Sequence, residues 1–551
     1  MSRASLRAGP WRLGLAGFVM IATSALGGTT VDWPQWRGPT RDGVAPPQKW
    51  SWEWPKEGPR KVWSANIGLG YASPIVSAGR VFAFGRVSRP VPGKNWSEVY
   101  GDCVTALDTE TGTVLWQVKA RADKGGEGVS STPCTDGERL YAASWDGEVT
   151  ALDVKTGAVV WQVNICKEYK TSKGGFHGIA NSPLIAGDAL VLAQGVALEK
   201  RTGKLLWQNQ TAMSSQHPSP VLCNVGNQSG VVFAARSLLR LDPMTGNPLW
   251  QFDLGKRQPV YIDPVVIGDQ ILSIEGAGGM KFSYTADSVQ QVKEGIFNGG
   301  YGYFGAGDCA NPVVWQGYLY AARHADGDRS GLLGDNPDLT RSSVACYDLK
   351  TLKSVWRKSG MAVTPIVCDG KLILQGLYGE VRVAEASPDG YKELANVKVF
   401  DWTRAGRGAL GQGSFSTPVL LDGRLYCREY HGELVCLDVS TNHPDAKAPD
   451  AARRIVGEAY TLTGTISARA DASDKSVVGL LKESPISGVE PHVYELCAVH
   501  HNDNPGFPKK AADLAATGSR VVVEGTLLNT NHNQFAITAI KAAEGVTDAP
   551  K

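Results

Sequence analysis

The chain has 551 residues, of which 42% are hydrophobic and 20% are charged, and its formal net charge is +2. These values exclude a disordered chain, a collagen, a polytopic membrane protein and a strongly basic nucleic-acid-binding protein. The 64 glycines and 16 tryptophans stand against only 6 methionines. This composition indicates an all-β protein with many strands and many tight turns.

The N-terminus has the pattern of an export signal, which we place at residues 1–28. Arg3, Arg7 and Arg12 precede an apolar stretch at residues 13–26 that ends in small residues. The stretch is shorter than the ~20 apolar residues of a membrane span, and no cysteine stands directly after it as a lipid-anchor site. The sequence therefore predicts a periplasmic or secreted protein with no transmembrane segment after signal cleavage.

One motif, Ala-x-Asp-x-x-x-Gly-x-x-x-Trp, recurs in five copies, the first at residues 106–116 and a worn fifth at residues 346–356. Each copy predicts a strand that ends at the acidic residue, a glycine turn, and a second strand that ends at tryptophan. Because the tryptophans are periodic, we expect them to fill the space between neighbouring sheets and not to stack on a cofactor. They are Trp116, Trp161, Trp207, Trp250 and Trp356.

A second marker, a polar residue followed by proline and an apolar run, occurs eight times at a mean spacing of about 49 residues. Since proline is confined to the first residue of a strand or to sheet edges, the marker shows where each unit begins. Eight units of four strands predict an eight-bladed β-propeller over residues 32–440. The polar residues, here called the pre-proline residues, are Ser73, Thr132, Ser182, Ser219, Asp263, Asn311, Thr364 and Thr417.

The two ends of the propeller complement each other. The eighth unit has three strands and no tryptophan strand, whereas residues 61–67 form a fourth strand without the other three. The N-terminal strand is therefore predicted to complete the last blade, which leaves no sheet edge exposed at the closure.

Residues 453–545 lack the repeat, and we predict that they form a separate OB-like β-barrel domain after a linker at residues 441–452. Strands are expected at residues 460–466, 493–499, 521–527 and 535–540, with a short helix at residues 511–516. No run of Lys and Arg alternates with aromatic residues, so nucleic acid is disfavoured as a partner. Five residues of this region match no standard zinc spacing and are expected at the surface. They are Cys497, His500, His501, Asp503 and His532.

The repeated motif resembles the tryptophan-docking motif of pyrroloquinoline-quinone (PQQ) propellers, and residues 32–39 are similar to the N-terminal segment of exported PQQ-like repeat proteins. The resemblance covers residues 32–440 and implies the propeller fold. In that family the same blades serve quinoprotein dehydrogenases, which hold a quinone on a calcium ion in the funnel. They also serve non-enzymatic proteins similar to BamB, the outer-membrane assembly factor.

Two predictions of function follow. The chain has neither the adjacent cysteine pair often found in the dehydrogenases nor a CxxCH haem site. The first prediction is therefore an exported binding or scaffold propeller, with a protein, small-molecule or glycan ligand at the funnel. The alternative is a quinoprotein dehydrogenase that uses PQQ and calcium to oxidise an alcohol or sugar.

In such a blade, the loop before the inner strand and the loop between the second and third strands face the funnel. Polar side chains that converge there form the default small-molecule site; alternatively, they cap strand ends or bind water across the funnel. Phe176, Gln216, Asp263 and Arg407 lie in these loops. The candidate cofactor-binding residues are His177, Asn181, His217, Tyr261, Asp308, Asn311, Arg404 and Gln412.

Two insertions, at residues 86–102 and 323–340, are predicted as long loops, which are more often functional than neutral. In the second, Asp326, Asp328 and Asp335 lack the later Glu of an EF-hand, so a solvated acidic loop is favoured over a calcium site. Most of the ten cysteines fall singly in apolar runs and are expected as buried thiols. Cys427 and Cys436 flank a predicted hairpin, where a disulfide is an alternative.

Overall fold

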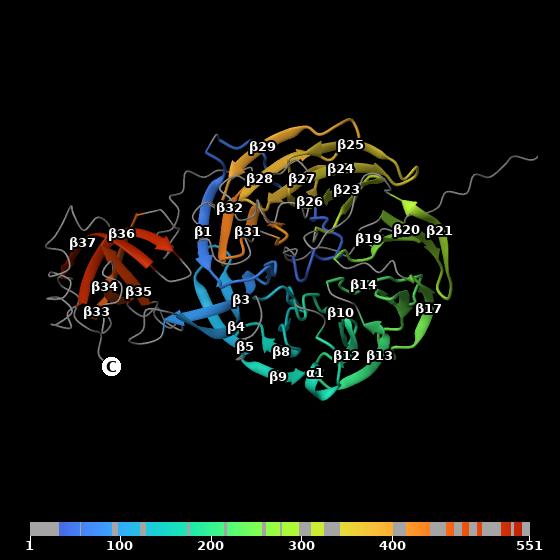
Figure 1. The fold of residues 1–551 in the computed structure, drawn as a ribbon, viewed down its shortest axis with the longest axis horizontal. Helices are drawn as coiled ribbons and strands as arrows, with labels where there is room; N and C mark the ends of the chain where they lie inside the picture. The colour runs from blue at the N-terminus through green and yellow to red at the C-terminus, as the bar shows by residue number, and fades with distance from the viewer. Residues whose placement is uncertain are drawn as a thin grey trace, which may run out of the picture.

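Eight four-stranded antiparallel sheets form the blades of a β-propeller in the computed structural model of the protein (Figure 1). Within the described residues, the regular structure is β-strand except for α1 (Ile165–Glu168) between the second and third blades. The prediction of an all-β, eight-bladed propeller is confirmed. The structure describes residues 32–55, 57–90, 97–121, 128–173, 177–213, 217–255, 261–275, 278–296, 310–323, 342–400, 415–440, 459–467, 477–483, 493–498, 520–529 and 534–542.

Blades 1 to 7 each use four strands that are consecutive in sequence, and the first of them, the inner strand, follows or contains the marker proline. Blades 1 and 2 consist of β2 (Ile75–Ser77), β3 (Arg80–Pro90), β4 (Ser97–Asp108) and β5 (Val114–Arg121), then β6 (Cys134–Thr135), β7 (Arg139–Ala143), β8 (Glu148–Asp153) and β9 (Val159–Asn164). Blades 3 and 4 consist of β10 (Leu184–Ala186), β11 (Ala189–Leu192), β12 (Gln194–Glu199) and β13 (Leu205–Met213), then β14 (Val221–Leu222), β15 (Val231–Ala234), β16 (Ser237–Leu241) and β17 (Pro248–Asp253).

Blades 5 to 7 repeat this order. They consist of β18 (Val265–Ile267), β19 (Gln270–Glu275), β20 (Gly278–Tyr284) and β21 (Val289–Ile296), then β22 (Val313–Trp315), β23 (Tyr318–Arg323), β24 (Ser343–Asp348) and β25 (Ser354–Ser359), then β26 (Val363–Cys368), β27 (Lys371–Gly376), β28 (Glu380–Glu385) and β29 (Glu393–Lys398).

Blade 8 is built from both ends of the propeller, as the sequence predicted. β30 (Val419–Leu421), β31 (Arg424–Arg428) and β32 (Glu433–Asp438) supply three strands, and β1 (Arg60–Asn66) pairs antiparallel with β32 as the fourth. Asp438 joins the two segments, because it binds Arg60 of β1 at 2.7 Å and Arg424 of β31 at 2.9 Å. The first strand of the propeller therefore holds the last blade by hydrogen bonds and by ion pairs.

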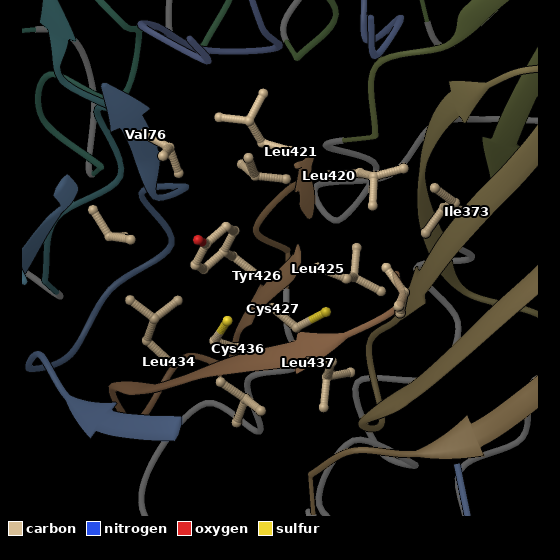
Figure 2. Close-up of a cluster of buried hydrophobic side chains, with 14 of the residues drawn as sticks. Val76, Ile373, Leu420, Leu421, Leu425, Tyr426, Cys427, Leu434, Cys436 and Leu437 are labelled. Atoms are coloured by element: carbon tan, nitrogen blue, oxygen red, sulfur yellow. The ribbon is translucent and has the colours of Figure 1, made fainter. Parts of the chain in front are cut away.

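The core of blade 8 lies between its neighbours on both sides (Figure 2). Its leucines gather with Val76 of blade 1 and Ile373 of blade 7, and all of these side chains are almost fully buried. Cys427 opposes Val435, whereas Cys436 opposes Tyr426, so the two cysteines point to opposite faces of the sheet. Both are buried, and neither forms a disulfide. The alternative of a disulfide between them is therefore wrong.

The five motif tryptophans, together with Trp63 of β1, join six of the eight blades to the blade that follows. Trp207 donates its indole N–H to the carbonyl of Pro243 in the following turn, at 2.8 Å. The motif glycine permits this approach, because a Cβ on Gly246 would lie 2.5 Å from the Trp207 ring. The same indole bond recurs from Trp63 to Thr109, Trp116 to Val154, Trp161 to Lys200, Trp250 to Thr285 and Trp356 to Ser387. The tryptophans thus have the structural role expected of them.

The C-terminal strands form a closed five-stranded barrel in the order β33-β34-β35-β37-β36. All neighbours are antiparallel except β35 and β37, which are parallel. The sequence predicted four of these strands and missed β34; its assignment to the OB class, the domain boundaries and the linker stay predictions. The predicted helix at residues 511–516 lies outside the described residues. The strands are β33 (Ala459–Ser467), β34 (Val477–Glu483), β35 (Val493–Ala498), β36 (Arg520–Asn529) and β37 (Gln534–Ala542).

Candidate functional site

A belt of hydrogen bonds runs around the propeller axis through the pre-proline residues. The backbone N–H of Ser73 donates to Thr132 Oγ1 of the next blade at 2.9 Å, and Thr132 N–H donates to Ser182 Oγ at 3.0 Å. The belt continues from Ser182 to Ser219 (3.0 Å), from Ser219 to Asp263 (2.6 Å), from Asp263 to Asn311 (2.8 Å) and, across the closure, from Thr417 to Ser73 (2.8 Å). Six of the pre-proline residues are polar for a shared reason, because their side chains accept a backbone N–H of the preceding blade.

Two residues considered for the funnel, Asp263 and Asn311, are hydrogen-bond acceptors in this belt. Asn311 is 7% exposed, and its Oδ1 accepts the N–H of Asp263. Asp263 is 1% exposed, and it accepts the N–H of Ser219 through Oδ1 and the indole N–H of Trp36 through Oδ2, the latter at 2.8 Å. For Asn311 the alternative role given above, a cap in the backbone scaffold, fits these contacts better than a ligand contact.

Residues 32–50 cross the middle of the ring and contact the inner strands of most blades; we call this segment the plug (Figure 1). Trp33 forms a two-way backbone bridge with Val76 of blade 1, at 2.7 and 2.9 Å. Ala45 N–H donates to the carbonyl of Val367 in blade 7 at 2.8 Å. Further bonds reach Thr135 of blade 2, Ser182 and Pro183 of blade 3, Asp263 of blade 5, Pro312 of blade 6 and Leu420 of blade 8.

Two buried arginines fix the plug. Arg41 donates to the carbonyls of Ser182 at 2.7 Å and Pro183 at 2.9 Å, and Arg37 donates to the carbonyl of Pro312. Both arginines have left-handed backbones, with φ of 61° and 63°, which non-glycine residues adopt at a cost. Burial lowers the pKa of Arg41 to about 10, and burial raises the pKa of Asp263, although the two arginine charges oppose that rise.

Beyond the belt, on the side away from the inner strands, three of the predicted residues come together. His177, His217 and Tyr261 enter from the loops before blades 3, 4 and 5 and stack in a row. The ring centroids are 5.1 Å apart for His177 and His217, and 4.9 Å apart for His217 and Tyr261. Burial, with the adjacent His177 as a smaller cause, lowers the pKa of His217 to about 3, so this imidazole is neutral at pH 7. The structure therefore presents a row of aromatic rings here, with the neutral imidazole of His217 in the middle.

Asn181 lies beside this stack, but it is engaged with its own blade. It is 3% exposed, and its Oδ1 accepts an N–H from the side chain of Gln194 at 3.0 Å. Asn181 directly precedes the belt residue Ser182, so its bond links the segment before β10 to the first residue of β12.

The sequence analysis missed a second aromatic group at the same end of the propeller. The ring of Tyr71 lies 4.7 Å from that of Tyr430 and 5.5 Å from that of Phe415. Tyr71 and Phe415 occupy the same repeat position as His217 and Tyr261, two residues before the pre-proline residue. Aligning the eight markers by this position would have found them. We call this set the mouth ring; its described members are Tyr71, Ser130, Ala180, His217, Tyr261, Ala362 and Phe415.

Several predicted residues fall outside the part of the chain that the structure describes. These are the candidates Asp308, Arg404 and Gln412, together with Phe176, Gln216, Arg407 and the acidic loop residues Asp326, Asp328 and Asp335. The signal segment, His500, His501, Asp503 and His532 also lie outside it. In the described ranges, no three His, Cys, Asp or Glu side chains come together as a metal site.

The structure corrects the prediction of a long loop at residues 86–102. The strands β3 and β4 continue through most of residues 86–102 as a long hairpin, in which Arg86 opposes Asp102. Asp102 is fully buried and binds Arg86 at 2.9 Å and Arg121 at 3.0 Å, and Arg121 also binds Asp146 at 3.0 Å. Arg86 and Asp102, the two ends of the predicted loop, belong to a buried ion-pair network with Arg121 and Asp146, whose charges compensate one another.

Comparisons with known proteins agree with this architecture. The family model described as outer membrane protein assembly factor BamB matches residues 53–197 and 193–292. BamB of Salmonella typhimurium (strain LT2) is 27% identical over 345 residues, which cover 58% of this chain and 76% of the relative. Over residues 53–292 the chain is similar to BamB-type PQQ propellers.

Solved structures show how widely this fold is used. The quinohemoprotein alcohol dehydrogenase of Comamonas testosteroni aligns with a TM-score of 0.52 and 14% identity, over 78% of this chain and 83% of that chain. BamB from Moraxella catarrhalis aligns with a TM-score of 0.47 and 16% identity, over 70% of this chain and 99% of that chain. The first likeness shows a common fold, which by itself fixes no activity.

The BamB-like propeller can be tested for the calcium-held quinone of the dehydrogenases. Calcium needs carboxylate or carbonyl oxygens as ligands. Asp263 and Asn311 direct side-chain oxygens at the belt, and Asn181 directs its oxygen at Gln194. The described residues at this end therefore do not fit the calcium ligand set.

Helix is confined to α1 in the part of the chain that the structure describes. Among the described residues, no helix has the length and apolar character needed to cross a membrane.

Proposed function

We propose that this BamB-like propeller is an exported binding module that holds its partner at the mouth ring and acts as a scaffold. The observation that carries the proposal is the stack of His177, His217 and Tyr261, which brings three consecutive blades to one aromatic surface. Aromatic side chains with a polar edge are the residues that dominate binding surfaces. The plug also favours the mouth ring as the binding face, because residues 32–50 already form hydrogen bonds with the inner strands.

The related assembly factor supports a scaffolding role over a catalytic one. The match covers 76% of that relative, so the resemblance extends over most of its length. Export rests on the basic start and the apolar stretch at residues 13–26. N-terminal sequencing of the protein recovered outside the cytoplasm tests export, with a new N-terminus between residues 22 and 30 as the expected result.

The second candidate function is a quinoprotein dehydrogenase, which the shared fold of the Comamonas enzyme favours. Titration of the mature protein with PQQ, with and without calcium, separates the two functions. Calcium-dependent binding together with dye-linked oxidation of an alcohol or sugar would replace the scaffold proposal. We expect neither, under conditions in which a known quinoprotein binds PQQ.

The binding face can be mapped in an exporting host with a photo-crosslinking amino acid. The probe replaces Tyr71 or Tyr261 in the mouth ring, and Val292 serves as the control because it lies on the outermost strand of blade 5 and is 56% exposed. Discrete adducts from both mouth positions and none from Val292 are expected. Adducts from Val292 alone would move the binding face to the rim and overturn the proposal.

A further inference from the structure

Four buried polar atoms at the mouth end of blades 2 to 4 have no hydrogen-bond partner. They are Ser131 Oγ and Ser144 Oγ, Gln194 Oε1 and His217 Nε2. Ser131 and Ser144 are fully buried, and Gln194 is 4% exposed. Buried polar side-chain atoms in native proteins are nearly always hydrogen-bonded, so a group of exceptions calls for a bound molecule that satisfies them.

Belt bonds and strand register connect the residues that carry these atoms across three adjacent blades. Ser131 directly precedes Thr132, and Thr132 N–H donates to Ser182, the residue that follows Asn181. Gln194 is fixed by its bond to Asn181 at 3.0 Å. In blade 2, Cys134 opposes Tyr141, and continuing this antiparallel register sets Ser131 opposite Ser144. His217 lies two residues before Ser219, which accepts the N–H of Ser182.

The chemistry of this group is neutral. It offers two hydroxyls, an amide oxygen and an imidazole nitrogen, which together accept and donate hydrogen bonds without a net charge. Two arginines of blade 1 form ion pairs with acidic residues, since Arg86 and Arg121 bind Asp102, and Arg121 also binds Asp146. The ligand that fits is therefore uncharged and rich in O–H groups.

The aromatic stack supplies the other half of the recognition. His177, His217 and Tyr261 form a row of neighbouring rings in the same loops. Aromatic side chains together with polar groups suit a ligand with one C–H face and several hydroxyls. We infer that this end of blades 2 to 4 binds a neutral sugar residue, with the two serines, Gln194 and His217 as its hydrogen-bonding partners. The inference rests on the proposed binding function of the mouth ring and names its ligand class.

The test is calorimetric titration of the full mature chain with three neutral oligosaccharides: maltotriose, cellotriose and triacetylchitotriose. The double variant Ser131→Ala/Ser144→Ala removes two of the unpartnered hydroxyls. Ser64→Ala is the matched control, because its Oγ is also buried without a partner but lies on β1, the outermost strand of blade 8. We expect one of the sugars to bind, the double variant to bind it at least tenfold more weakly, and the control to bind it as the wild type does.

Thermal melting without sugar gives an independent readout. If only a ligand satisfies the serines, the double variant melts at or above the wild-type temperature, because unsatisfied hydroxyls have been removed. No sugar binding together with a lower melting temperature would mean that ordered water holds these atoms, which overturns the inference. Protein adducts from Tyr261 without any sugar binding would leave the binding function standing and show that the ligand is a polypeptide.

Discussion

The belt around the propeller axis can be tested at Ser182. In Ser182→Ala, the N–H of Thr132 loses its acceptor at 3.0 Å, and both residues are almost fully buried, at 0% and 4% exposure. A buried donor left without a partner costs about 1–3 kcal/mol. We expect the variant to unfold in urea with that loss of stability, and the amide of Thr132 to exchange hydrogen faster in the native state.

Two controls separate the belt from general effects of substitution. Ser182→Thr keeps a hydroxyl at a position where blades 2, 7 and 8 already use threonine, so it should retain most of the stability. Ser354→Ala changes an exposed serine on β25 and should stay within about 0.5 kcal/mol of the wild type. If Ser182→Ala is as stable as Ser354→Ala, and Thr132 keeps its protection, the belt does not hold the blades together.

Two further predictions concern the contacts between blades. Gly246→Ala should lower the unfolding midpoint more than Gly187→Ala: both glycines have left-handed backbones, at φ of 69° and 64°, but only the added Cβ at position 246 meets the Trp207 ring, whereas nothing lies within 4 Å at position 187. An equal fall of the unfolding midpoint in the two variants would show that the destabilisation comes from backbone strain alone. At Asp438, burial raises the pKa, but hydrogen bonds from Arg60 and Ser440 and the Arg424 charge bring it below its usual value of 3.8. A carboxylate whose pKa is lowered in the folded state stabilises the fold at pH values above its unfolded pKa, and this stabilisation is lost as the pH falls. Stability should therefore decline below about pH 4. In acid denaturation curves, Asp438→Asn should be less stable than wild type at neutral pH and should decline less steeply. Parallel curves would show that Asp438 does not close blade 8.

The candidate site was only partly predictable from the sequence. His217 and Tyr261 were found because they are polar residues in loops that precede a marker proline. Tyr71 and Phe415 hold the same repeat position, but they were assigned no role because the markers were not aligned by that position. Asn311 was proposed as a ligand residue, whereas its amide accepts a backbone N–H of the neighbouring blade. A single-residue property cannot distinguish these roles, since both use a buried polar side chain near the axis.

The repeats alone determined the architecture, because each blade encodes its own boundaries. The marker proline sets where an inner strand begins, the glycine sets the outer turn, and the tryptophan docks on the next copy of the same turn. The last unit lacks a tryptophan strand, and an extra strand stands near the N-terminus. Together these two features predict how the ring closes. These signals are local and periodic, so they can be recognised in a single sequence.

Only the tertiary structure decided what residues 32–50 do and which atoms lie unpaired at the mouth. The plug bonds to strands that are up to several hundred residues away, such as Gln48 to Leu420, and no local pattern specifies those partners. Whether Ser131 or Gln194 is satisfied depends on which neighbours the closed ring brings within reach. Hydrogen bonding is short-ranged and directional, and its partners are therefore set by the fold of the whole chain.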